Sequence, residues 1–155
     1  MKKWMWIAAA LLAAVVFGIE SGAGMDVGML QPVQIVVVKR VGADVMVQTD
    51  TMDQGVGVDF ASAVENMKAS ASGEIFLETA DHLLLAPECV DFLEEVMQLL
   101  RPSCTVCLLD GEPDMEKLAD FLKIHVPSVT MAEYRAGIGK LQTLKSVEGR
   151  MRVVS

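Results

Sequence analysis

Basic residues are scarce in this sequence. Its 155 residues include 13 Lys and Arg against 21 Asp and Glu, which makes the formal net charge −8. A chain with this balance has no basic face with which to neutralise phosphates, so nucleic acid is not expected as a partner. Proline is also scarce, with five residues, and 52% of the chain is hydrophobic. This composition excludes a disordered chain and indicates a packed core.

Cysteine is scarce as well, with three residues. An odd number leaves at least one thiol of a monomer unpaired, which excludes a disulfide framework. Cys104 and Cys107 have the C-x-x-C spacing of redox pairs. The motif leads into an expected strand, however, and strand residues three apart point to opposite faces. Two buried thiols are therefore favoured over a redox pair. With only two His and no second C-x-x-C, a zinc site is not expected either.

The first 23 residues have the parts of an export signal. Lys2 and Lys3 precede the uncharged run 4–19, and small residues follow it. This run is shorter than the roughly twenty residues of a membrane-spanning helix. The pattern predicts a signal peptide or an uncleaved signal-anchor, and it leaves the two open. Either one places the rest of the chain at the outer face of the cytoplasmic membrane or outside the cell.

Strand and helix patterns alternate after this leader. They predict an α/β fold with a mixed, partly parallel sheet of four to six strands, covered by three to four helices and preceded by a hydrophobic N-terminal helix. A hairpin is expected from the β-branched run 32–41 and the alternating residues 45–49. The expected divisions are a leader over 1–23, a linker over 24–31 and a single α/β domain over 32–155.

The remaining expected elements follow from helical spacing and from turn residues. Helices are expected over 58–71, 87–100 and 113–125, a loop over 50–57, a strand over 74–86 that is bent or interrupted near Ala80 and Asp81, and a strand over 105–109. Thr130 and Glu133 form a capping-box pattern, which predicts the start of a helix. The tail 141–155 fits either a helix or two strands, and propensity does not decide between them.

Asp110, Glu112 and Asp114 form the densest group of acids, directly after an expected strand. They are the candidate ligands of a divalent cation, at the end of the strand where α/β sheets bind ligands. The alternative is that these acids occupy a turn and the first turn of a helix, where the helix dipole favours them. Their spacing matches no standard ion-binding loop.

The two histidines lack the neighbours that catalysis needs. His82 lies between Asp81 and three leucines, and His125 closes an expected helix, where a cation suits the dipole. Neither has a Ser or Cys nucleophile at a recognisable spacing. No catalytic residue and no cofactor are therefore expected, and the protein is not expected to be an enzyme.

The order of several features over residues 36–122 resembles the N-terminal domain of the spore germination Ger(x)C lipoproteins. The shared features are an exported leader, the strand pair VVVKRVGADVMVQT, an Ala-rich helix, His82 ahead of three leucines, and Arg101 ahead of another strand. The resemblance implies a non-catalytic, membrane-associated accessory domain of a spore-forming bacterium. Unlike that family, the chain has no lipid-bearing Cys after its leader.

These observations predict a non-catalytic interaction domain that is exported or membrane-anchored. Its expected partner is a protein at the membrane, and the N-terminal segment would contact the membrane if it is uncleaved. The alternative is a domain that binds a small ligand or a divalent cation through the acidic turn 110–116.

Overall fold

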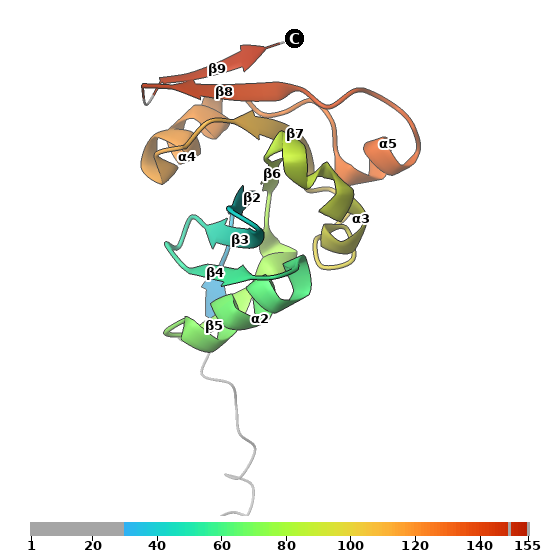
Figure 1. Ribbon diagram of the computed structural model, residues 1–155. Helices are drawn as coiled ribbons and strands as arrows, with labels where there is room; N and C mark the ends of the chain where they lie inside the picture. The colour runs from blue at the N-terminus through green and yellow to red at the C-terminus, as the bar shows by residue number, and fades with distance from the viewer. Residues whose placement is uncertain (1–29, 149, 155) are drawn as a thin grey trace, which may run out of the picture.

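In the part of the chain that the structure describes, the larger of two sheets has seven strands, in the order β4-β3-β2-β6-β7-β8-β9 (Figure 1). A computed structural model describes residues 30–148 and 150–154. The strands of this sheet are β2 (Ile35–Val41), β3 (Asp44–Thr49), β4 (Gln54–Gly57), β6 (His82–Leu85), β7 (Thr105–Asp110), β8 (Thr143–Val147) and β9 (Arg150–Val154). The inner strands β2, β6, β7 and β8 are parallel, and the outer pairings are antiparallel. The mixed, partly parallel α/β class is confirmed.

The sheet is wider than expected because two segments add strands to it. The tail resolves into β8 and β9, an antiparallel hairpin, rather than a helix. The loop expected over 50–57 is wrong for its second half, where β4 pairs with β3. Gly55 and Gly57 suggested a loop, but here they serve close packing. A Cβ on Gly55 would lie 2.1 Å from the carbonyl oxygen of Ala63, so only glycine lets the following helix approach β4 this closely.

Four α-helices lie in the described part of the chain. They are α2 (Phe60–Ser70), α3 (Leu93–Val96), α4 (Met115–Ile124) and α5 (Met131–Arg135), with 3-10 helices η3 (Leu77–Thr79) and η4 (Pro87–Phe92). The capping box predicted at α5 is confirmed, because the Thr130 hydroxyl accepts a bond from the Glu133 N–H and the Glu133 carboxylate accepts one from the Thr130 N–H. Asp59 caps α2 in the same manner with Ser62.

Two expectations for the middle of the chain have different outcomes. The strand expected over 74–86 is interrupted, as predicted: β5 (Glu74–Phe76) ends in η3, and β6 begins at His82. β5 pairs with β1 (Leu30–Pro32), so the small second sheet begins inside the expected linker. The continuous helix expected from Pro87 to Leu100 is wrong. Its first half is 3-10 helix, in which Cys89 and Phe92, three residues apart, both turn toward the core.

Buried side chains form one cluster on each face of the sheet. The larger cluster lies under α2, η4, α3 and α5, and it includes Phe60, Leu93 and Met131. The smaller cluster lies under α4. Its members are Ile35, Val37, Leu84, Cys107, Leu109, Met115, Leu118, Leu122 and Leu144. Successive side chains of a strand point to opposite faces of the sheet, so each inner strand contributes apolar side chains to both clusters.

The predicted leader lies outside the described residues. Within the described part, no helix is long and apolar enough to cross a membrane.

Candidate functional site

A crevice opens at the carboxyl ends of β2, β6 and β7. After β6 the chain passes to η4 on the larger-cluster face, and after β7 it passes to α4 on the opposite face. Open α/β sheets hold their ligands at such a divergence of neighbouring strands. A cavity of about 230 Å³ lies here, lined by Lys39, Arg40, Glu88, Asp110, Gly111 and Glu112 among others. We call it the carboxyl-edge crevice.

The charges of this crevice are mostly matched within the protein. The Lys39 ammonium donates to Glu112 Oε2 at 2.5 Å, and the Lys145 ammonium lies 3.1 Å from Asp110 Oδ2. The Arg40 guanidinium lies over the ring of Phe92, 5.2 Å from its centroid. Exposed ion pairs of this kind contribute little to stability. The crevice can accept a small polar ligand if these pairs open, but it offers no unpaired carboxylate cage.

The three candidate cation ligands have separate partners. Asp110 pairs with Lys145 and Glu112 pairs with Lys39, both at the crevice. Asp114 instead caps α4, where its Oδ1 accepts a bond from the Lys117 N–H at 3.3 Å. That bond is the main cause of the lowered pKa of Asp114. In residues 30–148 and 150–154 no three His, Cys, Asp or Glu side chains are placed to hold a metal ion. For Asp114, the helix-capping interpretation is confirmed.

The two cysteines of the C-x-x-C motif lie on opposite faces of the sheet, as predicted. Cys104 belongs to the larger cluster and Cys107 to the smaller one. Burial raises the pKa of each thiol to about 12. Both are therefore protonated near neutral pH and are poor nucleophiles. The geometry is that of two core side chains.

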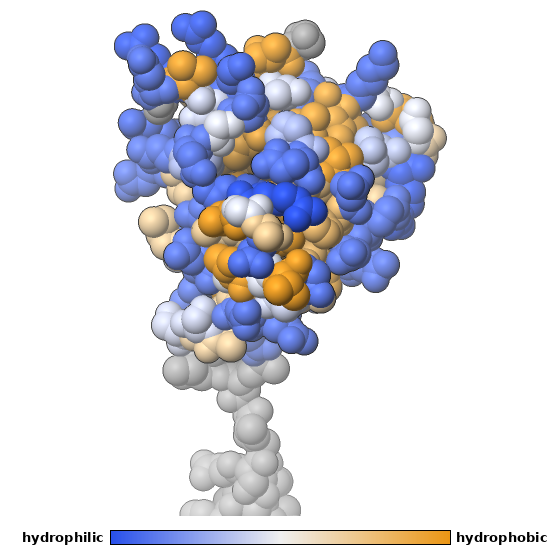
Figure 2. All heavy atoms as spheres, in the orientation of Figure 1, coloured by the Kyte–Doolittle hydropathy of each residue, from blue (hydrophilic) through white to orange (hydrophobic). Residues whose placement is uncertain are grey.

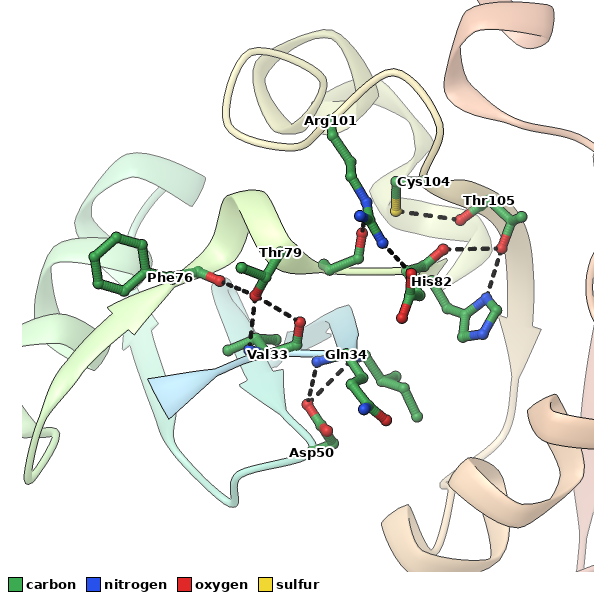
Figure 3. A network of polar contacts seen from close by, with 12 residues as sticks. Val33, Gln34, Asp50, Phe76, Thr79, His82, Arg101, Cys104 and Thr105 are labelled. Atoms are coloured by element: carbon green, nitrogen blue, oxygen red, sulfur yellow. Dashed lines mark hydrogen bonds and ion pairs between the residues drawn. The ribbon is translucent and has the colours of Figure 1, made fainter. Parts of the chain in front are cut away.

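His82 belongs to a polar network at the opposite end of the parallel strands (Figure 3). Its Nδ1 lies 2.7 Å from the Thr105 hydroxyl, which links the starts of β6 and β7. Arg101 pairs with Asp81, and its Nε donates to the carbonyl of Ala80 at 3.1 Å. Burial, more than the neighbouring charges, lowers the pKa of His82. The network braces the strand break and lies away from the crevice, which supports a structural role.

His125 also has a structural setting. It is the C-cap of α4, and its ring lies 4.5 Å from that of Phe121.

The outer edge of β9 is the feature that the sequence interpretation missed. Three valines of the β8–β9 hairpin are exposed: Val147 by 50%, Val153 by 43% and Val154 by 46%. No other described strand pairs with this edge. At the opposite edge of the sheet, α2 packs on the face of β4 that carries Gly55 and Gly57, and the Asn66 side chain donates to the Val56 carbonyl at 2.8 Å. Val56 is 38% exposed, so this edge is covered in part. The alternation of residues 150–154 in the sequence indicated a strand. It did not indicate that this strand lies at the edge of the sheet.

Comparison of the chain with protein-family models, with curated proteins and with solved structures finds no match. A functional proposal therefore depends on the arrangement of this chain's own residues.

Proposed function

We propose that this protein is a non-catalytic interaction domain that binds a protein partner through the open edge of β9. The observation that carries the proposal is the contrast between the two edges of the sheet. β4 has α2 packed against it and a side-chain hydrogen bond from Asn66 to its Val56 carbonyl, although Val56 is 38% exposed. β9 has two exposed valines, and within the described residues no side chain bonds its backbone and no further strand pairs with it. An open edge strand is a template for pairing with another chain, and proteins normally protect such edges. The β9 edge, with its exposed valines, is therefore suited to pairing with a strand of a protein partner.

The sequence supports a location for this interaction outside the cytoplasm. The basic and apolar leader over 1–23 favours export or membrane anchoring, and the acidic composition disfavours nucleic acid. We further propose that the partner is a protein at the outer face of the membrane. The resemblance to the Ger(x)C lipoproteins would place that role in sporulation or germination.

Site-specific cross-linking tests this function. A photoreactive residue at Val154 of the tagged full-length chain is expected to capture a protein in the membrane or extracellular fraction of the native host. The same residue at Val58, which is exposed near α2, is the matched control and should capture much less. A full-length protein found only in the cytosol, or equal capture at both positions, would contradict the proposal.

A small-ligand function through the acidic turn 110–116 is the second candidate. The carboxyl-edge crevice favours it, because Asp110 and Glu112 line a cavity at the expected ligand end of the sheet. A ligand that binds only the native state raises the melting temperature. Millimolar calcium, magnesium or manganese should then stabilise the wild type and not an Asp110→Ala, Glu112→Ala variant, which leaves the Asp114 cap of α4 in place. The absence of any difference between the two would exclude a cation in this role.

A further inference from the structure

We infer that the partner presents an extended segment of alternating acidic and apolar residues, which adds to β9 as an eighth strand. The inference rests on the proposed interaction function and specifies its chemistry. Figure 2 shows hydrophobic side chains between hydrophilic ones at the top of the molecule, where Figure 1 places β8 and β9.

The two faces of β9 differ in chemistry. In the register with β8, Val153 lies opposite Leu144, a buried member of the smaller cluster, and Met151 packs against the same cluster. Met151 and Val153 therefore share the α4 face of the sheet. Residues alternate between faces along a strand, so Arg150, Arg152 and Val154 lie on the other face. A strand added beside β9 meets apolar side chains on one face and two guanidinium groups on the other.

The guanidinium face has an excess of positive charge. Arg152 lies directly opposite Lys145, and like charges in directly opposed positions destabilise a strand pair. Asp110 pairs with Lys145, but neither Arg150 nor Arg152 has a carboxylate partner within the described residues. This excess occurs in a chain whose formal net charge is −8. Carboxylates on an added strand would complement both arginines.

A second copy of this chain fits the edge less well. An antiparallel two-fold pairing of β9 with itself places the arginines of both copies on one face of the continuous sheet. Centred on Arg152, that pairing sets the two Arg152 side chains opposite each other. Charged residues on an edge strand also act as a guard against such self-pairing. The charge pattern therefore disfavours pairing with a second copy of the chain and favours pairing with an acidic segment.

Strand addition divides affinity and specificity between backbone and side chains. Main-chain hydrogen bonds supply much of the affinity, and alternate side chains supply the specificity. The predicted partner pattern therefore has two requirements: free backbone N–H groups and a two-residue alternation of acid and apolar residues. Each can be removed from a probe without altering this protein.

Peptide binding tests both requirements. The probe is a fluorescein-labelled hexapeptide of alternating valine and glutamate, titrated with the full-length chain in nonionic detergent and followed by fluorescence anisotropy. We expect saturable binding that weakens with added salt. A peptide with three valines followed by three glutamates should bind several-fold more weakly, and a backbone N-methylated alternating peptide should not bind. An Arg150→Glu, Arg152→Glu variant should bind the alternating peptide about tenfold more weakly, because two attractive cross-strand pairs become repulsive.

A matched charge control separates the edge from the general field of the protein. The Lys68→Glu, Arg135→Glu variant makes the same change of charge at exposed helix positions, and it should bind the peptide within about twofold of the wild type. Equal binding of the N-methylated peptide would overturn strand addition. Equal binding by the Arg150→Glu, Arg152→Glu variant would overturn the acidic specificity. A dimer of the chain that the peptide does not dissociate would show that a second copy occupies the edge.

The two proposals fail in different ways. Capture of a protein at Val154 without binding of the alternating peptide would leave the interaction function standing and overturn only the acidic partner chemistry. Absence of both would overturn both.

Discussion

The Gly55→Ala variant is expected to lose about 3 kcal/mol of its free energy of unfolding. A Cβ at position 55 would lie 2.1 Å from the carbonyl oxygen of Ala63 and 2.4 Å from the amide nitrogen of Met67. Both are backbone atoms of α2, so no side-chain rotation relieves the contact and the helix must move away from β4. Urea unfolding of the full-length chain, followed by circular dichroism, measures the loss.

Gly42→Ala is the control for this substitution. Gly42 has a φ of +65°, but a Cβ there has no neighbour within 4 Å. The expected loss is the backbone cost alone, about 1–2 kcal/mol. Equal losses for the two variants would show that contact with α2 does not decide the stability at Gly55.

The same substitution has a consequence for the edge of the sheet. α2 covers β4, and Asn66 on that helix donates to the Val56 carbonyl. Displacement of α2 would expose this second edge, so the variant should exchange the amide hydrogens of β4 faster than the wild type.

The Leu84→Ala variant is expected to lose about 2–5 kcal/mol of its free energy of unfolding. Leu84 is fully buried on β6, between β2 and β7, and belongs to the smaller cluster. That cluster is the surface on which α4 packs. Truncation leaves a cavity in the centre of the sheet, since close-packed neighbours relax only partly. Urea unfolding gives the magnitude, and faster hydrogen exchange in α4 would locate the effect.

Ile124→Ala is the control for the loss of an aliphatic side chain. Ile124 lies on α4 but is 78% exposed, so its truncation should change the free energy of unfolding by no more than about 0.5 kcal/mol. A loss for Leu84→Ala as small as this would mean that the smaller cluster does not hold α4 on the sheet.

Local chemistry explains which elements could be predicted. The hairpin of β2 and β3, the caps at Thr130 and Asp114, and the buried face of α2 depend on residues close in sequence. Turn residues, capping hydroxyls and helical spacing report such contacts directly. The break before His82 was also visible, because the apolar runs 75–77 and 83–85 are separate, with Ala80 and Asp81 between them.

Elements whose signals depend on distant neighbours were misjudged. The glycines of β4 resembled those of a loop. Glycine is required there because α2, which begins later in the chain, packs so closely on β4 that a Cβ would collide with it. The 3-10 helix after Pro87 differs from the expected α-helix because the larger cluster receives Cys89 and Phe92 at a spacing of three. Neither requirement is present in the local sequence.

In the candidate site, too, the local features were predictable and the contacts between distant residues were not. The position of Asp110 and Glu112 after a strand predicted their place at the ligand end of the sheet, and the structure brings them to one crevice with Lys39 and Arg40. Their partners Lys39 and Lys145 are distant in sequence, so the ion pairs that occupy these acids could not be foreseen.

By itself, the sequence determines the α/β class, the helix caps and the acidic character of the chain, because these depend on composition and on contacts between near neighbours. Only the tertiary structure decides which strands become edges. Strand order depends on how helices cover the two faces. Among the residues that the structure describes, it leaves β4 partly covered by α2, and β9 open with two arginines that have no carboxylate partner there. An edge is a property of the whole sheet, since it is defined by the absence of a neighbouring strand in the described fold.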